Sequence, residues 1–304
     1  MPTLQRVICK VPGSTSNCGS GFDTLGLALS IYNEITVERG DAPREAGHGP
    51  DIFPESEMAQ KTAGLFFERA GIVPFEVRIR IRGDVPRARG LGSSVTVRAG
   101  ILAGLAELAG LGWDKERFVE LITELEGHPD NASASILGGF TVSRFLNSPA
   151  KVESVAQFDV DDDIRFVVVS PDFEVLTSAS RNALPKSLDF AHAIASINSA
   201  SCVVAALSSG KYEALTGSVH DFVHEPYRLK GIPGAASAIA AGIEAGAYTG
   251  WLSGSGSSVL CVCLAEKAKA VGAAMRAAFA DANLTSEEYD LTADNAGLEI
   301  VDRS

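Results

Sequence analysis

The sequence lacks any run of about 20 consecutive apolar residues, the length that crosses a bilayer, so we expect no membrane partner. Its five cysteines are an odd number without paired spacing, which excludes a disulfide scaffold and predicts packing roles for the thiols. The first residues contain neither a basic region followed by a hydrophobic run nor a small-residue cleavage site. We therefore expect a cytoplasmic protein.

Positive charge is also scarce in this chain. There are 26 Lys and Arg against 38 Asp and Glu, a net charge of −12, which argues against a nucleic-acid partner because such proteins usually present a basic face. The one basic cluster, residues 78–89, begins with arginines that alternate with Val77, Ile79 and Ile81. Alternation of this kind predicts a strand with a solvated arginine face.

The chain does contain enough apolar sequence for two domains, since 46% of its 304 residues are hydrophobic. Strands are expected at 6–11, 32–39, 75–82, 164–170 and 258–264. Helices are expected at 56–70, from 93 to about 110, and at 114–126, 189–208, 211–222, 234–246 and 265–282. This mixture, without strict strand–helix alternation, indicates an α+β fold. Three aspartates before residue 164 place the boundary between domains of residues 1–158 and 159–304.

Glycine spacing adds two local expectations. Residues 40–55 combine glycine, proline and charge, and this composition is typical of a surface excursion. Gly100 and Gly104 lie one turn apart in an expected helix. Two glycines on one face would allow a neighbouring backbone to pack closely against that helix.

Residues 90–94, Gly-Leu-Gly-Ser-Ser, lead directly into an apolar helix. Glycine lets a ligand approach the main chain, and the free N–H groups and dipole at a helix N-terminus favour an anion. A Walker loop is excluded because no Gly-Lys-Ser/Thr triplet follows. The alternative is a glycine turn with a serine cap, and the local sequence leaves both interpretations open.

Two polar loops also stand out. Residues 11–26 hold Asn17 and Asp23, and Asp23 could pair with a substrate ammonium group, or both side chains could only stabilise turns. Residues 251–264 alternate glycine with serine before an apolar strand. That pattern suits the close approach of a backbone or a ligand, or a flexible hairpin loop.

Residues 126–131, Glu-Gly-His-Pro-Asp-Asn, follow an expected helix. The Glu126 carboxylate could bind a hard cation such as Mg²⁺, which prefers oxygen ligands. His128 could act as a general base, although a single histidine in a turn is more often a hydrogen-bonding brace. The segment thus carries candidate metal and proton-transfer groups.

In this order and spacing, the segments resemble the GHMP kinase superfamily over essentially the whole chain. Residues 11–29 are similar to its opening motif, 90–94 to its phosphate loop and 252–256 to its third glycine-rich motif. Within the superfamily the chain looks most like the homoserine kinases. Similarity to these kinases lies at 126–140 and at two arginine-bearing segments, 177–185 and 224–228.

The resemblance implies an α+β, two-domain GHMP kinase fold, with a ribosomal-protein-type N-terminal domain and a ferredoxin-like C-terminal domain. The active site would lie in the cleft between them. The implied reaction moves the γ-phosphoryl group of ATP to the side-chain hydroxyl of L-homoserine, giving O-phospho-L-homoserine for threonine synthesis. The resemblance also makes a homodimer plausible.

Roles for individual residues follow from the same resemblance. Main-chain groups at the phosphate loop would wrap the triphosphate of ATP; these residues are Gly90, Leu91, Gly92, Ser93 and Ser94. Ser94 and Glu126 would hold Mg²⁺ between the β- and γ-phosphates. No catalytic base emerges, so we expect direct in-line transfer, in which positioning and charge stabilisation supply most of the catalysis.

The amino-acid substrate would be held by charge. Arg181 and Arg228 would clamp the homoserine carboxylate, a task that suits planar guanidinium groups, and Asp23 would pair with its ammonium group. The polar end and the attacking hydroxyl would be oriented by three further side chains, which are Asn17, His128 and Asn131.

The chain departs from the superfamily pattern at several positions. Small alanines usually follow the phosphate loop, whereas residues 95–98 here are Val-Thr-Val-Arg; Cys18 stands where leucine is usual, and 253–258 lacks a common proline. These changes bear on the shape of the nucleotide pocket. Two alternatives stay open: a GHMP kinase for another small hydroxylated metabolite, of mevalonate or shikimate type, and a non-catalytic ligand-binding relative.

Overall fold

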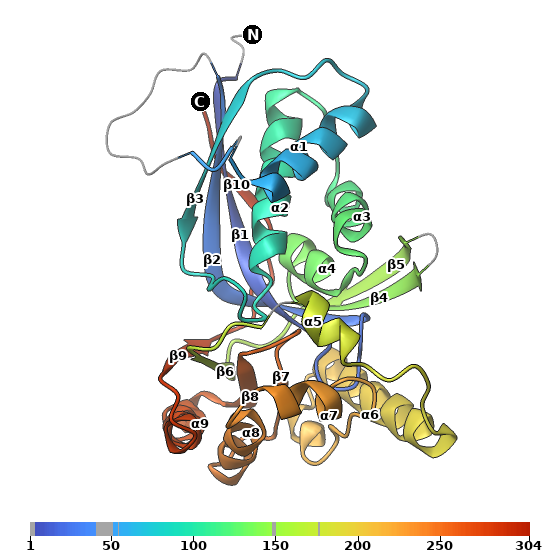
Figure 1. Cartoon of the computed structure of the whole chain (residues 1–304), viewed down its shortest axis with the longest axis vertical. Coiled ribbons are helices and arrows are strands. Elements are labelled where there is room, and N and C mark those ends of the chain that lie inside the picture. The colour runs from blue at the N-terminus through green and yellow to red at the C-terminus, as the bar shows by residue number, and fades with distance from the viewer. Residues whose placement is uncertain (1–3, 41–50, 54, 148–149, 176) are drawn as a thin grey trace.

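The computed structural model describes residues 4–40, 51–53, 55–147, 150–175 and 177–304 as two stacked parts, each built on one sheet (Figure 1). Most of the expected excursion at 40–55 lies outside the described residues. The elements of the first part, in chain order, are β1 (Arg6–Ser16), β2 (Leu25–Arg39), α1 (Glu57–Ala70), β3 (Val77–Gly83), α2 (Ser93–Leu108), α3 (Lys115–Glu126), α4 (Asp130–Leu137), β4 (Phe140–Asn147) and β5 (Ala150–Phe158).

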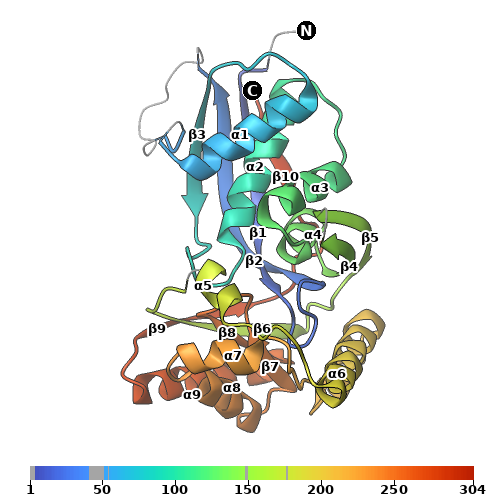
Figure 2. The same cartoon turned by 45° about the vertical axis from the view of Figure 1, so that its right-hand side comes forward.

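The second part contains the elements that follow, except for the last strand. They are β6 (Ile164–Pro171), α5 (Thr177–Asn182), α6 (Phe190–Ser209), α7 (Glu225–Arg228), α8 (Ala235–Glu244), β7 (Thr249–Leu252), β8 (Val259–Leu264), α9 (Ala268–Asp281) and β9 (Ser286–Leu291). The last strand, β10 (Glu299–Arg303), belongs to the first sheet. Short 3₁₀ turns lie at Tyr212–Leu215, Leu229–Gly231 and Ala265–Lys267. Helices α8 and α9 pack on the second sheet, whereas α6 projects to one side (Figure 2).

Strand order separates the two sheets. The first has the order β10-β1-β2-β4-β5, with β3 also paired to β2, and the second has the order β7-β8-β6-β9. A division of the chain after residue 158 therefore separates the sheets for every strand except β10. This last strand returns to pair with β1, where Val7 lies opposite Arg303.

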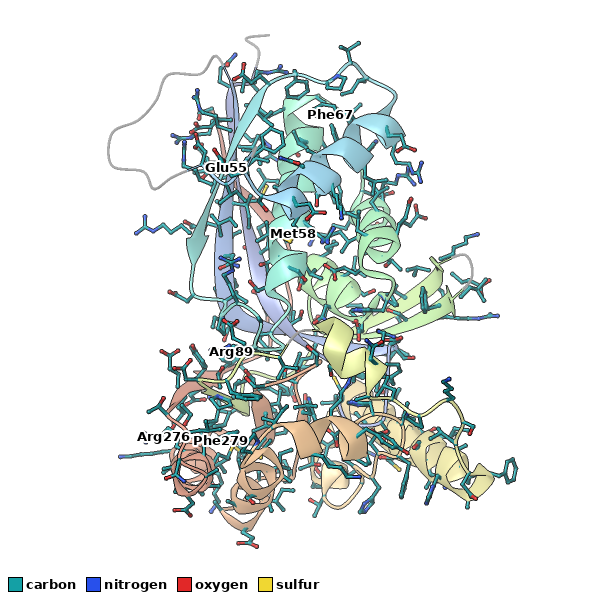
Figure 3. The ribbon with its side chains drawn as sticks, viewed as in Figure 1. Glu55, Met58, Phe67, Arg89, Arg276 and Phe279 are labelled. Atoms are coloured by element: carbon teal, nitrogen blue, oxygen red, sulfur yellow. The ribbon has the colours of Figure 1, made fainter. Side chains whose placement is uncertain are left out.

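The cores explain how the two parts are held together. Phe67 of α1 belongs to the upper core and Phe279 of α9 to the lower one (Figure 3). A third cluster joins them, because Leu27 and Phe140 of the first sheet share it with Phe166 of the second. A shared, dry cluster fixes the sheets relative to each other, and so it fixes the geometry of the space between them.

The expected close packing at α2 is confirmed. A Cβ at Gly100 would lie 2.5 Å from Ile35, and one at Gly104 would lie 2.5 Å from Val37. Both partners are in β2, so the paired glycines let α2 lie directly on the sheet. The phosphate-loop end of α2 is positioned by this contact.

The expected solvated arginine face of β3 is confirmed at Arg82, which is exposed, and is wrong at Arg78 and Arg80. The guanidinium of Arg80 is buried and bonded to Glu38, which is itself buried on the neighbouring strand, and its Nη1 lies 3.1 Å from Oδ1 of Asp51. Arg78 also reaches Glu38, at 3.5 Å. Alternation correctly identified the strand, but it could not reveal that Glu38 lies beside these arginines and neutralises them.

The expected helix at 211–222 is also wrong beyond its first turn. After Tyr212–Leu215 the chain leaves helical geometry, and the Asp221 carboxylate then accepts hydrogen bonds from three following N–H groups. The donors are Val223, His224 and Glu225. The Asp221 side chain thus takes the place of backbone acceptors for these N–H groups. The next helix, α7, begins directly after this turn.

Cysteine packing follows the expectation in most cases. All five cysteines are free thiols; four are buried and Cys202 on α6 is exposed. Burial raises the pKa of the Cys9 and Cys18 thiols well above the usual range. These two groups therefore stay protonated and act as small apolar side chains.

Candidate active site

A cavity of about 840 Å³ opens where the two parts meet. It is lined by all but one of the residues predicted for the site, which are Asn17, Asp23, Gly90, Gly92, Ser93, Ser94, Glu126, His128, Asn131, Arg181 and Arg228. The exception is Leu91, whose side chain is buried in the shared apolar cluster. Its carbonyl accepts a bond from the Ser14 N–H, so Leu91 anchors the phosphate loop to β1.

The phosphate loop exposes the N-terminus of α2. Gly92 is the N-cap residue, has a φ of 70° and makes no side-chain cap, which rules out the serine-cap interpretation. Its missing Cβ would lie 2.4 Å from Ser14 Oγ, and that of Gly90 would lie 2.1 Å from the Ser253 carbonyl. With no capping side chain, N–H groups of the first turn remain available to an anion in the cavity.

The second glycine-serine segment packs onto this loop. Ser253 donates to the Gly90 carbonyl at 2.8 Å, and the Gly254 carbonyl accepts from Asn17 Nδ2 and Arg228 Nη1. The expected close approach of a backbone is therefore confirmed. Ser253 was missed by sequence reasoning because serine in a glycine-rich stretch is also typical of an unstructured loop.

Asn17 and Asp23 belong to one turn, but their side chains make different contacts. Asn17 Oδ1 accepts from the Asp23 N–H at 3.1 Å, as the turn interpretation predicts. The Asp23 carboxylate instead faces the cavity and binds Arg181 of α5, with distances of 2.8 and 2.9 Å. Both residues have positive φ, 66° and 53°, which is costly for residues other than glycine and is frequent at functional sites.

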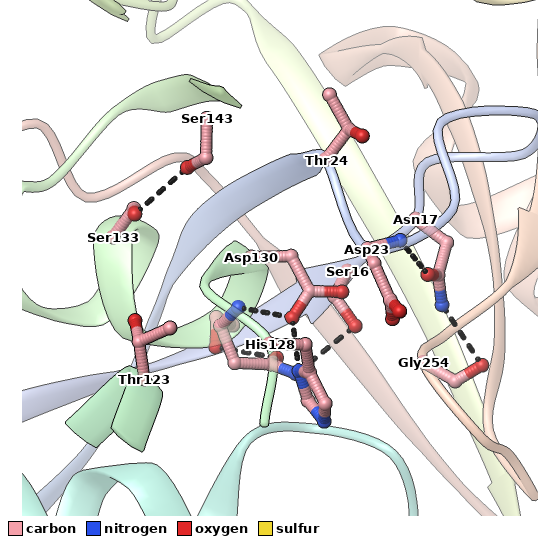
Figure 4. Close-up of polar contacts among 12 residues, drawn as sticks. Ser16, Asn17, Asp23, Thr24, Thr123, His128, Asp130, Ser133, Ser143 and Gly254 are labelled. Atoms are coloured by element: carbon pink, nitrogen blue, oxygen red, sulfur yellow. Dashed lines mark hydrogen bonds and ion pairs between the residues drawn. The ribbon is translucent and has the colours of Figure 1, made fainter. Parts of the chain in front are cut away.

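His128 and Asp130 form a buried ion pair, 2.7 Å between Nδ1 and Oδ1 (Figure 4). Burial lowers the pKa of His128, but the charges of Asp130 and Asp23 and the hydrogen bond to Asp130 outweigh it and raise that pKa to about 9. Burial acts to raise the pKa of Asp130, yet His128 and the Asn131 N–H lower it overall. His128 is therefore an imidazolium near neutral pH and has no free base to offer. The brace interpretation is the one this geometry supports.

Asp130 was not singled out from the sequence, although it is central to the site. It begins α4, where an acidic residue is favoured by the helix dipole. Ligand atoms of Asp23, His128 and Asp130 lie within 4.8 Å of one another. Because His128 is cationic and Asp23 is bonded to Arg181, this cluster suits an ammonium group better than a metal ion.

Asn131 is held against β1 by two serines. Its Nδ2 donates to Ser16 Oγ at 3.0 Å, and its Oδ1 accepts from Ser14 Oγ at 2.9 Å. With both ends of the amide in use, the side chain is fixed at the cavity wall. Neither serine was among the predicted site residues, because each is one of several in a polar strand end.

Arg228 presents an incompletely bonded guanidinium to the cavity. Only 6% of the residue is exposed, Nη1 bonds the Gly254 carbonyl, and Nε has no hydrogen-bond partner. Burial and the neighbouring Arg181 lower the pKa of Arg228 to about 10, so it remains cationic at neutral pH. The Phe22 ring lies 5.2 Å from both guanidinium groups and holds them on the same side of the cavity. An anion is the natural ligand for the orphaned donor.

Oxygen donors suited to Mg²⁺ lie near the phosphate loop. The Glu126 carboxylate ends α3 and the Ser94 hydroxyl lies in the first turn of α2, and both residues line the cavity. Hydroxyl and carboxylate oxygens are ligands that Mg²⁺ accepts, with phosphate and water completing its shell. The residues present therefore fit the ion.

The unusual segment at 95–98 has a clear place in the site. Val95 and Val97 are buried and line the cavity, and Thr96 accepts a bond from Asn33 at 2.8 Å. Arg98 forms an ion pair with Glu126. The bulkier side chains thus form a wall of the cavity and also fill the core.

Comparison with known proteins agrees with this geometry. The family model of the GHMP kinases N terminal domain matches residues 57–139, and that of the GHMP kinases C terminal matches residues 204–281. Curated homoserine kinases of Prochlorococcus marinus and Moorella thermoacetica are 35% and 34% identical. The matches cover 90% and 97% of this chain, and 89% and 99% of those proteins.

Solved structures give the same result. The crystal structure of homoserine kinase from Cytophaga hutchinsonii has a TM-score of 0.85 and 25% identity, with 98% of each chain covered. The phosphomevalonate kinase of Streptococcus pneumoniae, 16% identical with a TM-score of 0.68, shares the fold. Fold and site define a small-molecule kinase of two domains, as expected from the sequence. The chain belongs to the GHMP kinases, and within them to the homoserine kinases.

Proposed function

We propose that the protein transfers the γ-phosphoryl group of ATP to the side-chain hydroxyl of L-homoserine. One observation carries the proposal: a single cavity contains both an uncapped helix N-terminus and a cluster of two guanidinium and two carboxylate groups. The first suits a triphosphate, and the second suits a zwitterion. A substrate with an ammonium group, a carboxylate and a hydroxyl satisfies the second cluster.

The substrate end works by exchange of charge partners. In the structure Asp23 and Arg181 neutralise each other. An amino-acid zwitterion can enter between them, so that Asp23 receives its ammonium group while Arg181 and Arg228 receive its carboxylate. Asp23 and Arg181 each exchange one ionic partner for another, and the unpaired Nε of Arg228 gains an acceptor. Asn17, His128 and Asn131 then orient the polar end of the substrate and its hydroxyl.

The phosphate end relies on the main chain. N–H groups at 90–94 hold the triphosphate at the positive end of α2, and Ser94 and Glu126 hold Mg²⁺. The ion, when bound, neutralises charge on the phosphates during transfer. Because His128 is cationic near neutral pH, it can stabilise negative charge but cannot accept the hydroxyl proton. Positioning for in-line transfer is therefore the main contribution of the protein.

The proposal is tested by a coupled ADP-release assay with Mg-ATP and a panel of acceptors. The panel contains homoserine, mevalonate, shikimate and galactose. Turnover is expected with homoserine, since the other three carry no ammonium group for Asp23. Turnover with another member but not with homoserine would favour a different GHMP kinase, and binding of ATP without any turnover would favour a non-catalytic relative.

We further propose that two copies associate through α6. Phe190, Ile194 and Ile197 lie on one face of this helix and are 81%, 44% and 65% exposed. The helix carries no Asp, Glu, Lys or Arg, so two copies of a chain with net charge −12 can meet there without like-charge repulsion. A second copy would cover the stripe as in a helix pair.

By length and composition, α6 alone among the described helices could cross a membrane. Its opposite face is fastened to the body of the protein, because Ser199 donates to the Ser218 carbonyl at 2.6 Å and Ser196 accepts from the Phe222 N–H at 3.2 Å. A helix held in this way remains part of the folded domain. We propose a cytoplasmic enzyme, since both of its proposed substrates are metabolites of that compartment.

A further inference from the structure

Arg98 lies one turn after Ser94 on α2, and its Nε is 2.8 Å from Oε1 of Glu126 at the end of α3. Both side chains are largely buried, 14% and 15% exposed. The contact is an ion pair rather than an aligned hydrogen bond, because neither Nε nor Nη1 of Arg98 has a hydrogen-bond acceptor. The guanidinium therefore depends on the charge of Glu126 for its compensation.

Burial decides what Glu126 can do when a cation enters the cavity. A buried guanidinium that loses its carboxylate becomes an uncompensated charge, which is strongly unfavourable. Glu126 must therefore keep Arg98 as a partner. The ion pair engages Oε1, and the second oxygen of the carboxylate remains for a cation. Mg²⁺ needs only one oxygen from such a group, since phosphate and water complete its shell.

We propose that Arg98 is a positioning residue that fixes the Glu126 carboxylate so that one oxygen is presented to the Mg²⁺ of the bound nucleotide. This inference rests on the proposed function, in which Ser94 and Glu126 hold that ion. Groups that orient a metal-binding carboxylate from behind commonly contribute about 10- to 100-fold to metal affinity. Residues 95–98, Val-Thr-Val-Arg, differ from the small alanines usual in the superfamily. Through Arg98, this difference would serve the metal site as well as the core.

A competing role for Arg98 predicts the opposite change in Mg²⁺ binding when the guanidinium is removed. If Arg98 occupied Glu126 at the expense of the ion, removing the guanidinium would make the carboxylate more available and would strengthen Mg²⁺ binding. The positioning role predicts that the carboxylate, once released, adopts other rotamers and binds the ion less well. The direction of the change therefore separates the two roles.

The test measures ATP binding to the full chain by titration calorimetry, once with Mg²⁺ and once with EDTA. Arg98→Met is expected to weaken Mg-ATP binding about 10-fold and to change metal-free ATP binding less than about twofold. Arg276→Met is the control for loss of an arginine–glutamate pair outside the cavity, because it removes the more exposed pair with Glu288, at 2.7 Å, in the second part of the molecule. It should change neither affinity.

A double-mutant cycle with Glu126→Gln completes the test. In that background, Arg98→Met should add little further loss of Mg-ATP affinity. Tighter Mg-ATP binding in Arg98→Met, an equal loss in EDTA, or a full additional loss beside Glu126→Gln would each overturn the proposal. Should Arg98→Met unfold, Arg98→Lys keeps the charge without the planar fork, and a smaller loss confined to Mg-ATP is expected; no loss would contradict the proposal.

Because these titrations contain no acceptor, they stand apart from the test of homoserine as the substrate. A chain that fails to phosphorylate homoserine could still show the expected dependence on Arg98. A wild-type chain whose ATP affinity is the same with and without Mg²⁺ would overturn both the positioning role and the assignment of the ion to Ser94 and Glu126.

Discussion

Asp23 and Arg181 bind each other through both carboxylate oxygens and both terminal guanidinium nitrogens, at 2.8 and 2.9 Å. They come from the turn after β1 and from α5, 158 residues apart in the chain. Any ligand that uses Arg181 for its carboxylate must open this pair. A zwitterion compensates Asp23 with its own ammonium group, whereas a plain carboxylate leaves Asp23 without a partner.

This relationship predicts how Asp23→Asn changes substrate choice. 4-Hydroxybutyrate has the carboxylate and hydroxyl of homoserine but no amino group, so the wild type should discriminate strongly against it. In Asp23→Asn the penalty for leaving Asp23 unpaired is gone, and the ratio of the two kcat/KM values should fall about tenfold or more. Steady-state kinetics with both acceptors measure the ratio, and an unchanged ratio would remove Asp23 from the ammonium site.

Arg228→Ala should mainly raise the KM for homoserine, by about 1–3 kcal/mol of lost binding energy, because a buried, charge-assisted contact to the carboxylate disappears. The KM for ATP should stay near the wild-type value. Arg228→Lys keeps the positive charge but loses the planar guanidinium group that can bind a carboxylate with two hydrogen bonds. Its KM for homoserine should therefore lie between those of the wild type and Arg228→Ala. If only the KM for ATP changed, Arg228 would belong to the nucleotide site.

The His128–Asp130 pair predicts a pH dependence of stability. Because folding raises the pKa of His128 from 6.5 to about 9, protonation of His128 stabilises the fold below pH 6.5. That stabilisation, of about 3 kcal/mol, is lost as the pH rises through about 9. Chemical denaturation at pH 6 and pH 10 should therefore show a large difference between wild type and His128→Gln at pH 6 and a small one at pH 10. A difference that grows with pH would contradict the ion pair.

Short motifs correctly predicted which segments line the cavity. Residues 90–94, Glu126 and the two arginines could be singled out because each combines chemically distinctive residues with a resemblance at a fixed spacing, and their roles there remain proposals. Asp130 and Ser253 could not, since an acidic helix start and a serine beside glycine each have ordinary structural explanations. The ion pair between Arg98 and Glu126 was equally invisible, because only the packing of α2 on α3 brings the two residues together.

The fold was predictable to a similar degree. Apolar alternation correctly identified β3, whereas β10 was missed because five residues that are mostly polar or exposed become a strand only by pairing with β1. The helix expected at 211–222 forms only one turn, Tyr212–Leu215, and the Asp221 carboxylate then binds the N–H groups of the residues that lead into α7. The strand thus depends on a long-range pairing and the end of the helical turn on local side-chain bonds, and neither is visible in hydrophobic periodicity.

Gly92→Ala tests whether residues 90–94 bind ATP. Gly110→Ala is its control for the backbone strain that alanine causes at a positive φ. Gly92 and Gly110 both have positive φ, 70° and 67°, so alanine at either position should cost about 1–2 kcal/mol of stability. A Cβ at Gly92 would also lie 2.4 Å from Ser14 Oγ, whereas a Cβ at Gly110 meets nothing within 4 Å. Thermal unfolding should therefore rank Gly92→Ala lower, and only this variant should lose ATP affinity. Equal ATP binding in both variants would remove the loop from the nucleotide site.

Self-association through α6 is tested by placing a charge in its exposed stripe. Ile197 is 65% exposed at the C-terminal end of that stripe, and Val73 is a matched control because it is 86% exposed but lies outside α6. A carboxylate buried at a helix–helix contact is strongly unfavourable, so Ile197→Asp should be a monomer while Val73→Asp keeps the wild-type state. Sedimentation velocity at micromolar concentration measures the masses. A wild type that remains monomeric, or an Ile197→Asp variant that still dimerises, would rule out α6 as the interface, and binding of the wild type to lipid vesicles would identify a different occupant of the stripe.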